Sequence, residues 1–259
     1  MEGSRMAPRT RNFRQLHEAS ELLLEKLGML GPRQRAAFDE KFRMSWIFHD
    51  FALEGTVLSV AEIKAAIDPE IISTPQLIPA YNHIASLYEG IDHILDSRGK
   101  RLSLNLDWLK RVHQILLPAD KKDQVQYRKD NPIHRMYFHE LAAADKISYR
   151  MRKLTDWFRT EECKRAHPIE LACEVHREVI RILPWPDISG RVARLAMNHI
   201  LVNENYWPAI IHHVDRHRYY DTLQRDQDEL LELVVESIRE GMVASNKLYQ
   251  SIVDSSREF

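Results

Sequence analysis

Glycine and cysteine are scarce in this chain, and their scarcity narrows the choice of fold. The 259 residues include 8 glycines and 2 cysteines. So few glycines argue against a fold rich in tight turns, because turns with positive φ depend on glycine. Cys163 and Cys173 have no partners at metal-ligand spacing, so we expect them to be reduced thiols in a cytoplasmic protein.

The sequence also lacks a strong net charge and a long apolar run. Its formal net charge is -1, which favours neither a nucleic acid nor a membrane surface as a partner. No stretch is long enough to span a bilayer, and the first residues lack an apolar signal core. We interpret residues 1–13 as a disordered tail or an expression-vector remnant. Residues 14–259 are predicted to form a single soluble domain.

Apolar residues recur at helical spacing through most of the chain, which predicts an all-α fold. Between residues 121 and 141 the helical period fades, and residues 133–139 are predicted to be extended. Ser59 is expected to cap the third helix. The helices are predicted over residues 14–27, 32–52, 60–67, 74–98, 103–116, 144–159, 168–183, 190–203 and 216–255, the last one broken near Gly241.

The stretch LPWPDISGRVAR, from Leu183 to Arg194, gives the strongest indication of a ligand site. It has the composition of a proline-stiffened loop that leads into a helix. Backbone N–H groups at a helix N-terminus attract anions, and the two arginines would add charge-assisted bonds. A divalent metal held by Asp187 would bridge phosphate oxygens. The residues predicted to bind a phosphate-bearing ligand are Ser189, Gly190, Arg191 and Arg194.

Simpler interpretations of these residues stay open. The arginines could be ordinary helix-surface charges, and Asp187 could simply cap the helix. His213 and His217 lie four residues apart, a spacing that suits two metal ligands on one helix face. No glutamate lies between them, so solvated histidines are favoured. Core packing is the predicted role of Tyr219, Tyr220, Trp157, Trp185 and Trp207.

The loop resembles the signature of the Fic family, His-x-Phe-x-(Asp/Glu)-Gly-Asn-Gly-Arg-x-x-Arg. The preceding HPIELACEVHREVIRI and the following RLAMNHILVNENYWPAIIHHVDRHRYYDTLQR resemble the family's neighbouring helices. Tyr127-Arg128 and the extended segment after it resemble the family's flap. The resemblance implies a Fic-like helical domain with a small β-hairpin flap. Its core would span about residues 74–240, with inhibitory-type N-terminal helices in residues 14–70.

Members of this family typically transfer AMP from ATP to a hydroxyl of a target protein. By position, the resemblance places the family's proton-accepting histidine on Leu183, which cannot accept a proton. The metal-binding acid falls on Asp187, and the first glycine of the signature falls on Ile188. We expect Ile188 to alter the anion-binding turn, because a β-branched residue rarely adopts positive φ.

Leu53-Glu54-Gly55 resembles the end of the family's inhibitory motif, (Ser/Thr)-x-x-x-Glu-(Gly/Asn). The resemblance implies that Glu54 pairs with Arg194 and competes with the terminal phosphate of a nucleotide. The Ser/Thr of the motif falls on Asp50, so the motif is incomplete. A helix-end acid that faces water is the simpler interpretation of Glu54.

Three functions stay open. The first is a binding or regulatory module that keeps a phosphate or Mg²⁺–nucleotide site without ordinary AMP transfer. The second is an active nucleotidyltransferase or phosphotransferase that uses another base, for which His134 and His139 are candidates. The third is a structural protein-interaction subunit. ATP or another nucleotide, Mg²⁺ and a target protein are the expected ligands and partners.

Overall fold

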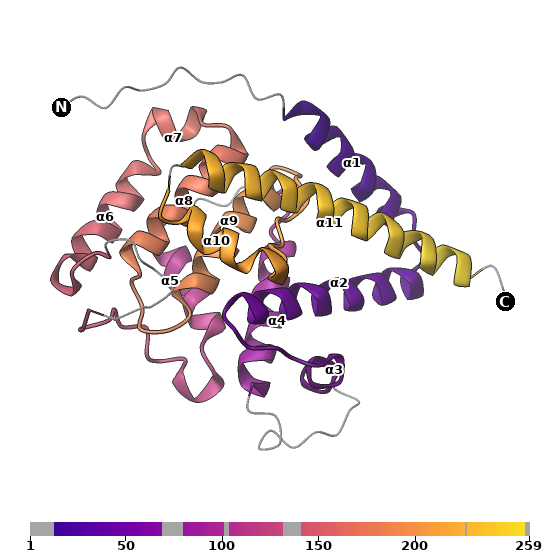
Figure 1. Ribbon diagram of the computed structural model, residues 1–259, viewed down its shortest axis with the longest axis horizontal. Helices are drawn as coiled ribbons and strands as arrows, with labels where there is room; N and C mark the ends of the chain where they lie inside the picture. The colour runs from indigo at the N-terminus through magenta and orange to yellow at the C-terminus, as the bar shows by residue number, and fades with distance from the viewer. Residues whose placement is uncertain (1–12, 69–79, 101–103, 132–140, 226, 257–259) are drawn as a thin grey trace.

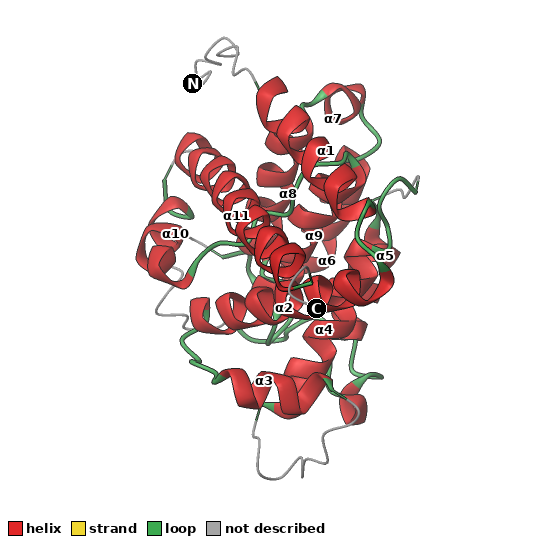
Figure 2. Ribbon diagram, turned by 90° about the vertical axis from the view of Figure 1, so that its right-hand side faces the viewer, coloured by secondary structure: helices red, strands yellow, loops and turns green. Residues whose placement is uncertain are grey.

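The computed structural model describes residues 13–68, 80–100, 104–131, 141–225 and 227–256, and these ranges contain helices and loops but no strand (Figure 2). The extended segment predicted over residues 133–139 lies outside them. The α-helices are α1 (Arg14–Gly28), α2 (Pro32–Leu53), α3 (Val60–Ile67), α4 (Tyr81–Leu95), α5 (Leu106–Leu116), α6 (Ile147–Trp157), α7 (Glu161–Arg165), α8 (Pro168–Ile182), α9 (Ser189–Asn203), α10 (Arg216–Thr222) and α11 (Gln227–Ser255).

Local capping chemistry explains where two of the helices begin. The Ser59 hydroxyl accepts a hydrogen bond from the Glu62 backbone N–H at 3.2 Å, and the Glu62 carboxylate accepts from the Ser59 N–H at 2.7 Å. This capping box confirms the predicted start of α3. The predicted start of α5 at residue 103 is wrong. The helix begins at Leu106, because the Asn105 side chain accepts from the Trp108 N–H at 2.9 Å and caps it.

The predicted break near Gly241 is also wrong, since α11 runs without interruption from Gln227 to Ser255. Gly241 lies where α11 passes the Trp207 ring. A Cβ at position 241 would come within 3.2 Å of Trp207 Cδ1. The glycine therefore permits close packing between the helix and a buried tryptophan instead of ending the helix.

Helix α9 is the central element of the fold. Every residue from Ser189 to Val202 is buried. Helices α8, α4 and α5 pack against α9, and the long α11 crosses α8, α2 and α1 (Figure 1). Because α9 is enclosed by α8, α4 and α5, the start of α9 fixes the position of the loop that precedes it.

Several predicted features of the core are present. Trp185, Trp207, Tyr219 and Tyr220 are buried, while Trp157 is partly buried. Both cysteines are buried thiols outside any disulfide. Among the described residues, no helix combines the length and hydropathy that a bilayer span requires.

Candidate functional site

The loop between α8 and α9, residues 183–188, forms one wall of a cavity of about 540 Å³. That volume lies within the range of small-molecule sites. The end of α2, the start of α4 and the short helix Ala119–Lys121 contribute to the other walls. The residues that line the cavity are Glu54, His83, Lys121, Leu183, Trp185, Pro186, Asp187, Ile188, Ser189, Gly190 and Tyr220.

The loop contains two residues in the left-handed region of backbone space. Leu183, at the end of α8, has φ 44°, and Ile188, before α9, has φ 52°. The expectation that Ile188 would avoid positive φ is therefore wrong. A left-handed residue other than glycine costs about 1–2 kcal/mol, so packing must offset this strain. Ile188 packs against the core, and Leu183 is buried.

Arg128 fastens the loop to the end of α8, a role that the sequence analysis missed. Its Nε donates to the Leu183 carbonyl at 2.7 Å, and its backbone N–H donates to the Pro184 carbonyl at 2.9 Å. Its Nη2 donates to the Ile182 carbonyl at 3.2 Å. A guanidinium at a helix C-terminus satisfies carbonyls that have no partner within the helix. Only the resemblance of Tyr127-Arg128 to a family segment pointed to this residue.

Within the loop, the Trp185 side chain is fully buried and stacks on His113, with ring centroids 4.3 Å apart. The Ser189 hydroxyl accepts from the Trp185 N–H at 2.9 Å and donates to the Trp185 carbonyl at 3.0 Å. The hydroxyl of Ser189 is therefore engaged within the loop. A ligand at this position would meet the backbone of Ser189 and Gly190 rather than that hydroxyl.

The two arginines of the predicted ligand site are buried in a cluster with Asp50 of α2 and Glu54, the residue that follows α2. Arg194 donates from Nε to Asp50 Oδ2 at 2.7 Å and from Nη2 to Glu54 Oε1 at 2.7 Å. Arg191 donates from Nε to Asp50 Oδ1 at 3.1 Å, and its Nη2 lies 2.9 Å from Glu54 Oε2. The expected Glu54–Arg194 pair is present, and Asp50 is an additional partner of both arginines.

Burial and pairing oppose each other in this cluster. Burial alone would raise the pKa of Asp50, but the guanidiniums of Arg194 and Arg191 outweigh it and hold that pKa below its ordinary value. Burial alone would lower the pKa of Arg194, whereas Asp50 and Glu54 raise it well above the ordinary value. Asp50 and Arg194 are therefore both charged at neutral pH, and their buried charges compensate each other.

Glu54 belongs both to this cluster and to the cavity wall. The carbonyl of the preceding residue, Leu53, accepts from Arg216 Nε at 2.8 Å and from the Tyr220 hydroxyl at 3.2 Å. These bonds fix the end of α2, after which Gly55 turns the chain with φ 93°. The Glu54 side chain is 27% exposed, against 2% for Asp50. Glu54 is thus the member of the cluster that a ligand in the cavity would meet first.

On the cavity side, Asp187 is exposed and does not cap α9, and no other side chain of the described residues caps it. Among the described residues, no group of three or more His, Cys, Asp or Glu side chains could hold a metal. A single carboxylate fits Mg²⁺ only where phosphate oxygens and water supply the other ligands. Asp187 therefore suits a metal that arrives with a phosphate-bearing ligand.

His83, on α4, is a cavity residue that the sequence analysis missed. Burial lowers its pKa, and the positive charges of Arg191 and Lys121 lower it further, while Asp187 and Glu54 act in the opposite direction. The imidazole is therefore neutral at pH 7. No sequence pattern marked it among 13 histidines. The two histidines predicted as candidate bases, His134 and His139, lie outside the described residues.

The predicted solvation of His213 and His217 is confirmed, because both side chains are exposed. His213 lies beside His49, with the two Nδ1 atoms 3.2 Å apart. Burial, followed by the neighbouring His212 and His213, lowers the pKa of His49 to about 4.

Comparison with known proteins relates residues 103–201 to the Fic/DOC family, whose model they match. A protein adenylyltransferase Fic of Nematostella vectensis is 28% identical over 196 residues, 75% of this chain and 45% of the relative. A relative of the same name from Culex quinquefasciatus is 27% identical over 183 residues, 69% of this chain and 36% of the relative. The chain thus spans less than half the length of these relatives.

Solved structures show the same fold. A Fic domain containing signaling protein from Bacteroides thetaiotaomicron aligns with a TM-score of 0.73 and 20% identity, covering 93% of this chain and 97% of that one. Fic-1 from C. elegans aligns with a TM-score of 0.72 and 18% identity, covering 91% and 71%. The all-helical fold of the described residues is therefore Fic-like, and residues 103–201 match the Fic/DOC family model.

Proposed function

From the match of residues 103–201 to the Fic/DOC family model, we propose that this chain binds a phosphate-bearing ligand of the Mg²⁺–nucleotide class and does not carry out ordinary AMP transfer. The observation that carries the proposal is Leu183. An apolar side chain lines the cavity at the position where the resemblance places the proton-accepting histidine. Loss of a general base typically lowers the rate by about 10²- to 10⁴-fold.

The N-terminus of α9 and Lys121 are the groups that would receive the phosphates. Within the described ranges no side chain caps this helix end, so its first N–H groups can bind an anion. Lys121 lines the same cavity and adds a positive charge. Asp187 would hold Mg²⁺ against phosphate oxygens, where the metal would neutralise part of their charge.

Helix α2 acts in this proposal as a lock on the site. Glu54 and Asp50 occupy the hydrogen-bonding groups of Arg194 that a terminal phosphate would use. A diphosphate that does not reach Arg194 is unaffected by the lock, whereas a triphosphate must displace Glu54. Asp50 would stay in place, because it is buried and bonded to both arginines.

A labelled-ATP transfer assay with Mg²⁺ tests the loss of AMP transfer. We expect no labelling of the parent chain or of a generic protein target. The Leu183→His/Glu54→Gly variant should gain transfer, because it supplies a base and removes part of the lock. Histidine also tolerates the left-handed backbone at position 183 better than most residues. Strong labelling by the unmodified chain would refute the proposal.

Calorimetry with ATP and ADP in the presence of Mg²⁺ tests the binding site. Glu54→Gly should tighten ATP by about tenfold and leave ADP nearly unchanged, since a charge-assisted bond contributes about 1.5–3 kcal/mol. Glu40→Gly, which changes an acid of α2 outside the cluster, is the control. If neither the parent chain nor a variant binds a nucleotide, the cluster of the two arginines and two carboxylates only stabilises the fold. The chain would then be a protein-interaction subunit.

The neutral imidazole of His83 in the cavity wall favours a second candidate, a transferase that uses this residue as its base. Under this alternative the parent chain labels a target and His83→Gln abolishes the labelling. Under the main proposal both proteins are inactive, so the transfer assay separates the two.

A further inference from the structure

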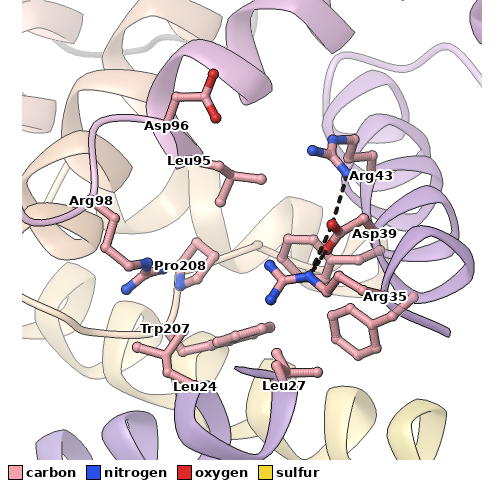
Figure 3. A pocket seen from close by; sticks show the side chains of 12 residues that line it. Leu24, Leu27, Arg35, Asp39, Arg43, Leu95, Asp96, Arg98, Trp207 and Pro208 are labelled. Carbon is pink, nitrogen blue, oxygen red and sulfur yellow. Dashed lines mark hydrogen bonds and ion pairs between the residues drawn. The ribbon is translucent and has the colours of Figure 1, made fainter. Parts of the chain in front are cut away.

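A second cavity, of about 180 Å³, lies between α1, α2, the end of α4 and the connector that carries Trp207 and Pro208 (Figure 3). It shares no lining residue with the cavity beside the α8–α9 loop. Liquid water takes up about 30 Å³ per molecule, so the volume corresponds to about six waters. The apolar lining residues are Leu24, Leu27, Phe38, Phe42, Leu95, Trp207 and Pro208.

Three arginines also line this cavity, and two of them are neutralised by nearby carboxylates. Arg35 donates from Nε to Asp39 at 2.9 Å. Arg43 forms an ion pair with Asp92 and lies 3.8 Å from Asp39. These arginines project from α2 into or along the cavity, with the dashed contacts of Asp39 between them (Figure 3). Their charges therefore need no further partner.

Arg98 differs from both of them. Among the described residues, no carboxylate forms an ion pair with it, and its hydrogen bond to the Val202 carbonyl is long at 3.4 Å. Burial, and then the positive charge of Arg35, lowers its pKa to about 10. Asp96 lies at the exposed rim and shifts the pKa of His93, not that of Arg98.

A half-buried cation without a counter-charge is costly, and an anion in the cavity would remove that cost. Arg98 and Arg35 approach the cavity from different sides, with the Trp207 ring and the aliphatic side chains between them (Figure 3). The Trp207 and Phe42 rings lie 5.1 Å apart, centroid to centroid. The two ring planes meet at 61°, edge to face. The cavity thus combines one unmatched guanidinium with apolar walls of aromatic and aliphatic side chains.

We propose that this cavity binds a small organic monocarboxylate with an apolar body. One unmatched positive charge calls for one negative charge, which a carboxylate supplies and a phosphate dianion exceeds. The planar fork of a guanidinium matches a carboxylate in two parallel hydrogen bonds. The apolar walls favour a ring or short branched body over a hydrated inorganic ion.

Calorimetry on the whole chain with benzoate as the probe tests this site. We expect saturable binding of benzoate, and binding of neutral benzamide at least about tenfold weaker. Arg98→Gln should weaken benzoate by about 10- to 100-fold, the range expected for a lost charge-assisted contact. Arg159→Gln, at a side chain 82% exposed, is the matched control and should leave binding unchanged.

Leu95→Phe gives a second readout, because it fills the cavity and leaves every charge in place. It should abolish benzoate binding even if Arg98→Gln proves unable to fold. Absence of saturable benzoate binding to the parent chain would overturn the proposal. So would benzoate binding that neither Arg98→Gln nor Leu95→Phe changes. Inorganic phosphate binding more tightly than benzoate through Arg98 would overturn the assignment to a carboxylate.

Discussion

Charged side chains on the two sides of the α8–α9 loop differ in burial and in pairing. Behind the loop, Arg191 and Arg194 are buried, and Asp50 and Glu54 accept their hydrogen bonds. On the cavity side, Asp187 is exposed and has no ion pair within the described part of the chain. Buried charges must be matched inside the protein, whereas exposed ones remain free for a ligand. Arginines whose sequence pattern resembles a phosphate site can therefore act mainly to stabilise the fold.

Removal of Arg194 should break this contrast most strongly. Arg194→Ala leaves the carboxylate of Asp50 buried with only Arg191 as a partner. Breaking a buried ion pair in this way typically costs about 3–5 kcal/mol. We expect a loss of this size in the free energy of unfolding, measured by urea denaturation at neutral pH.

The matched control is Arg14→Ala, which breaks an exposed pair with Glu18 on α1. Its two side chains are 81% and 55% exposed, and such pairs contribute about 0–1 kcal/mol. If Arg194→Ala costs no more than this control, the cluster does not hold α2 against α9. The proposed lock would then lose its structural basis.

A fall in pH should affect the charges on the two sides of the loop differently. Burial lowers the pKa of His113, which stacks under Trp185 on the cavity side, to about 4. The unfolded chain therefore binds a proton more readily than the folded one between about pH 6.5 and pH 4. The stability that neutral His113 provides is present above this window and is lost as the pH falls through it. Asp50, with its lowered pKa, stays charged over the same window.

His113→Phe should reduce the slope of stability against pH by up to about 1.4 kcal/mol per pH unit. The phenyl ring can still stack on Trp185. Urea unfolding at several pH values within the window measures the slope, and the exposed His217→Phe is the control. His49, His176 and His199 also have lowered pKa values, so the His113→Phe variant should keep part of the acid dependence. An unchanged slope would show that protonation of His113 does not contribute to the pH dependence of stability.

Local features of the fold were predictable from the sequence, and long-range partners were not. Ser59 and the start of α3 follow from spacing alone, because a capping box is complete within four residues. Asp50 and Arg194 are 144 positions apart in the chain. No periodicity encodes such a pair, so the sequence predicted the arginines as ligand groups without their second carboxylate. The Glu54 pair was expected only through the family resemblance.

Arg128 and Ile188 show two other limits of sequence reasoning. Arg128 donates to carbonyls at the end of α8, 54 and 55 residues further along the chain. Local capping patterns do not cover such a separation. Propensity predicted that Ile188 avoids positive φ, yet the enclosed position of α9 imposes that conformation. Tertiary context therefore overrides a local preference where a loop enters a buried helix.

The smallest expected effect comes from this strained residue. Ile188→Gly and Ile188→Ala remove the same side chain beyond Cβ, so both lose its packing against the core. Only glycine adopts the left-handed conformation without strain, at the cost of a more flexible unfolded chain. The glycine variant should therefore be more stable than the alanine variant by about 1 kcal/mol in urea unfolding.

The same pair of changes at Ser45, within helix α2, should reverse the order, because glycine weakens a helix interior by about 1 kcal/mol. Equal stability of the two Ile188 variants would mean that the loop relaxes when the side chain is lost. In that case the cavity side would hold its shape through packing of Ile188 rather than through the backbone fixed by α9.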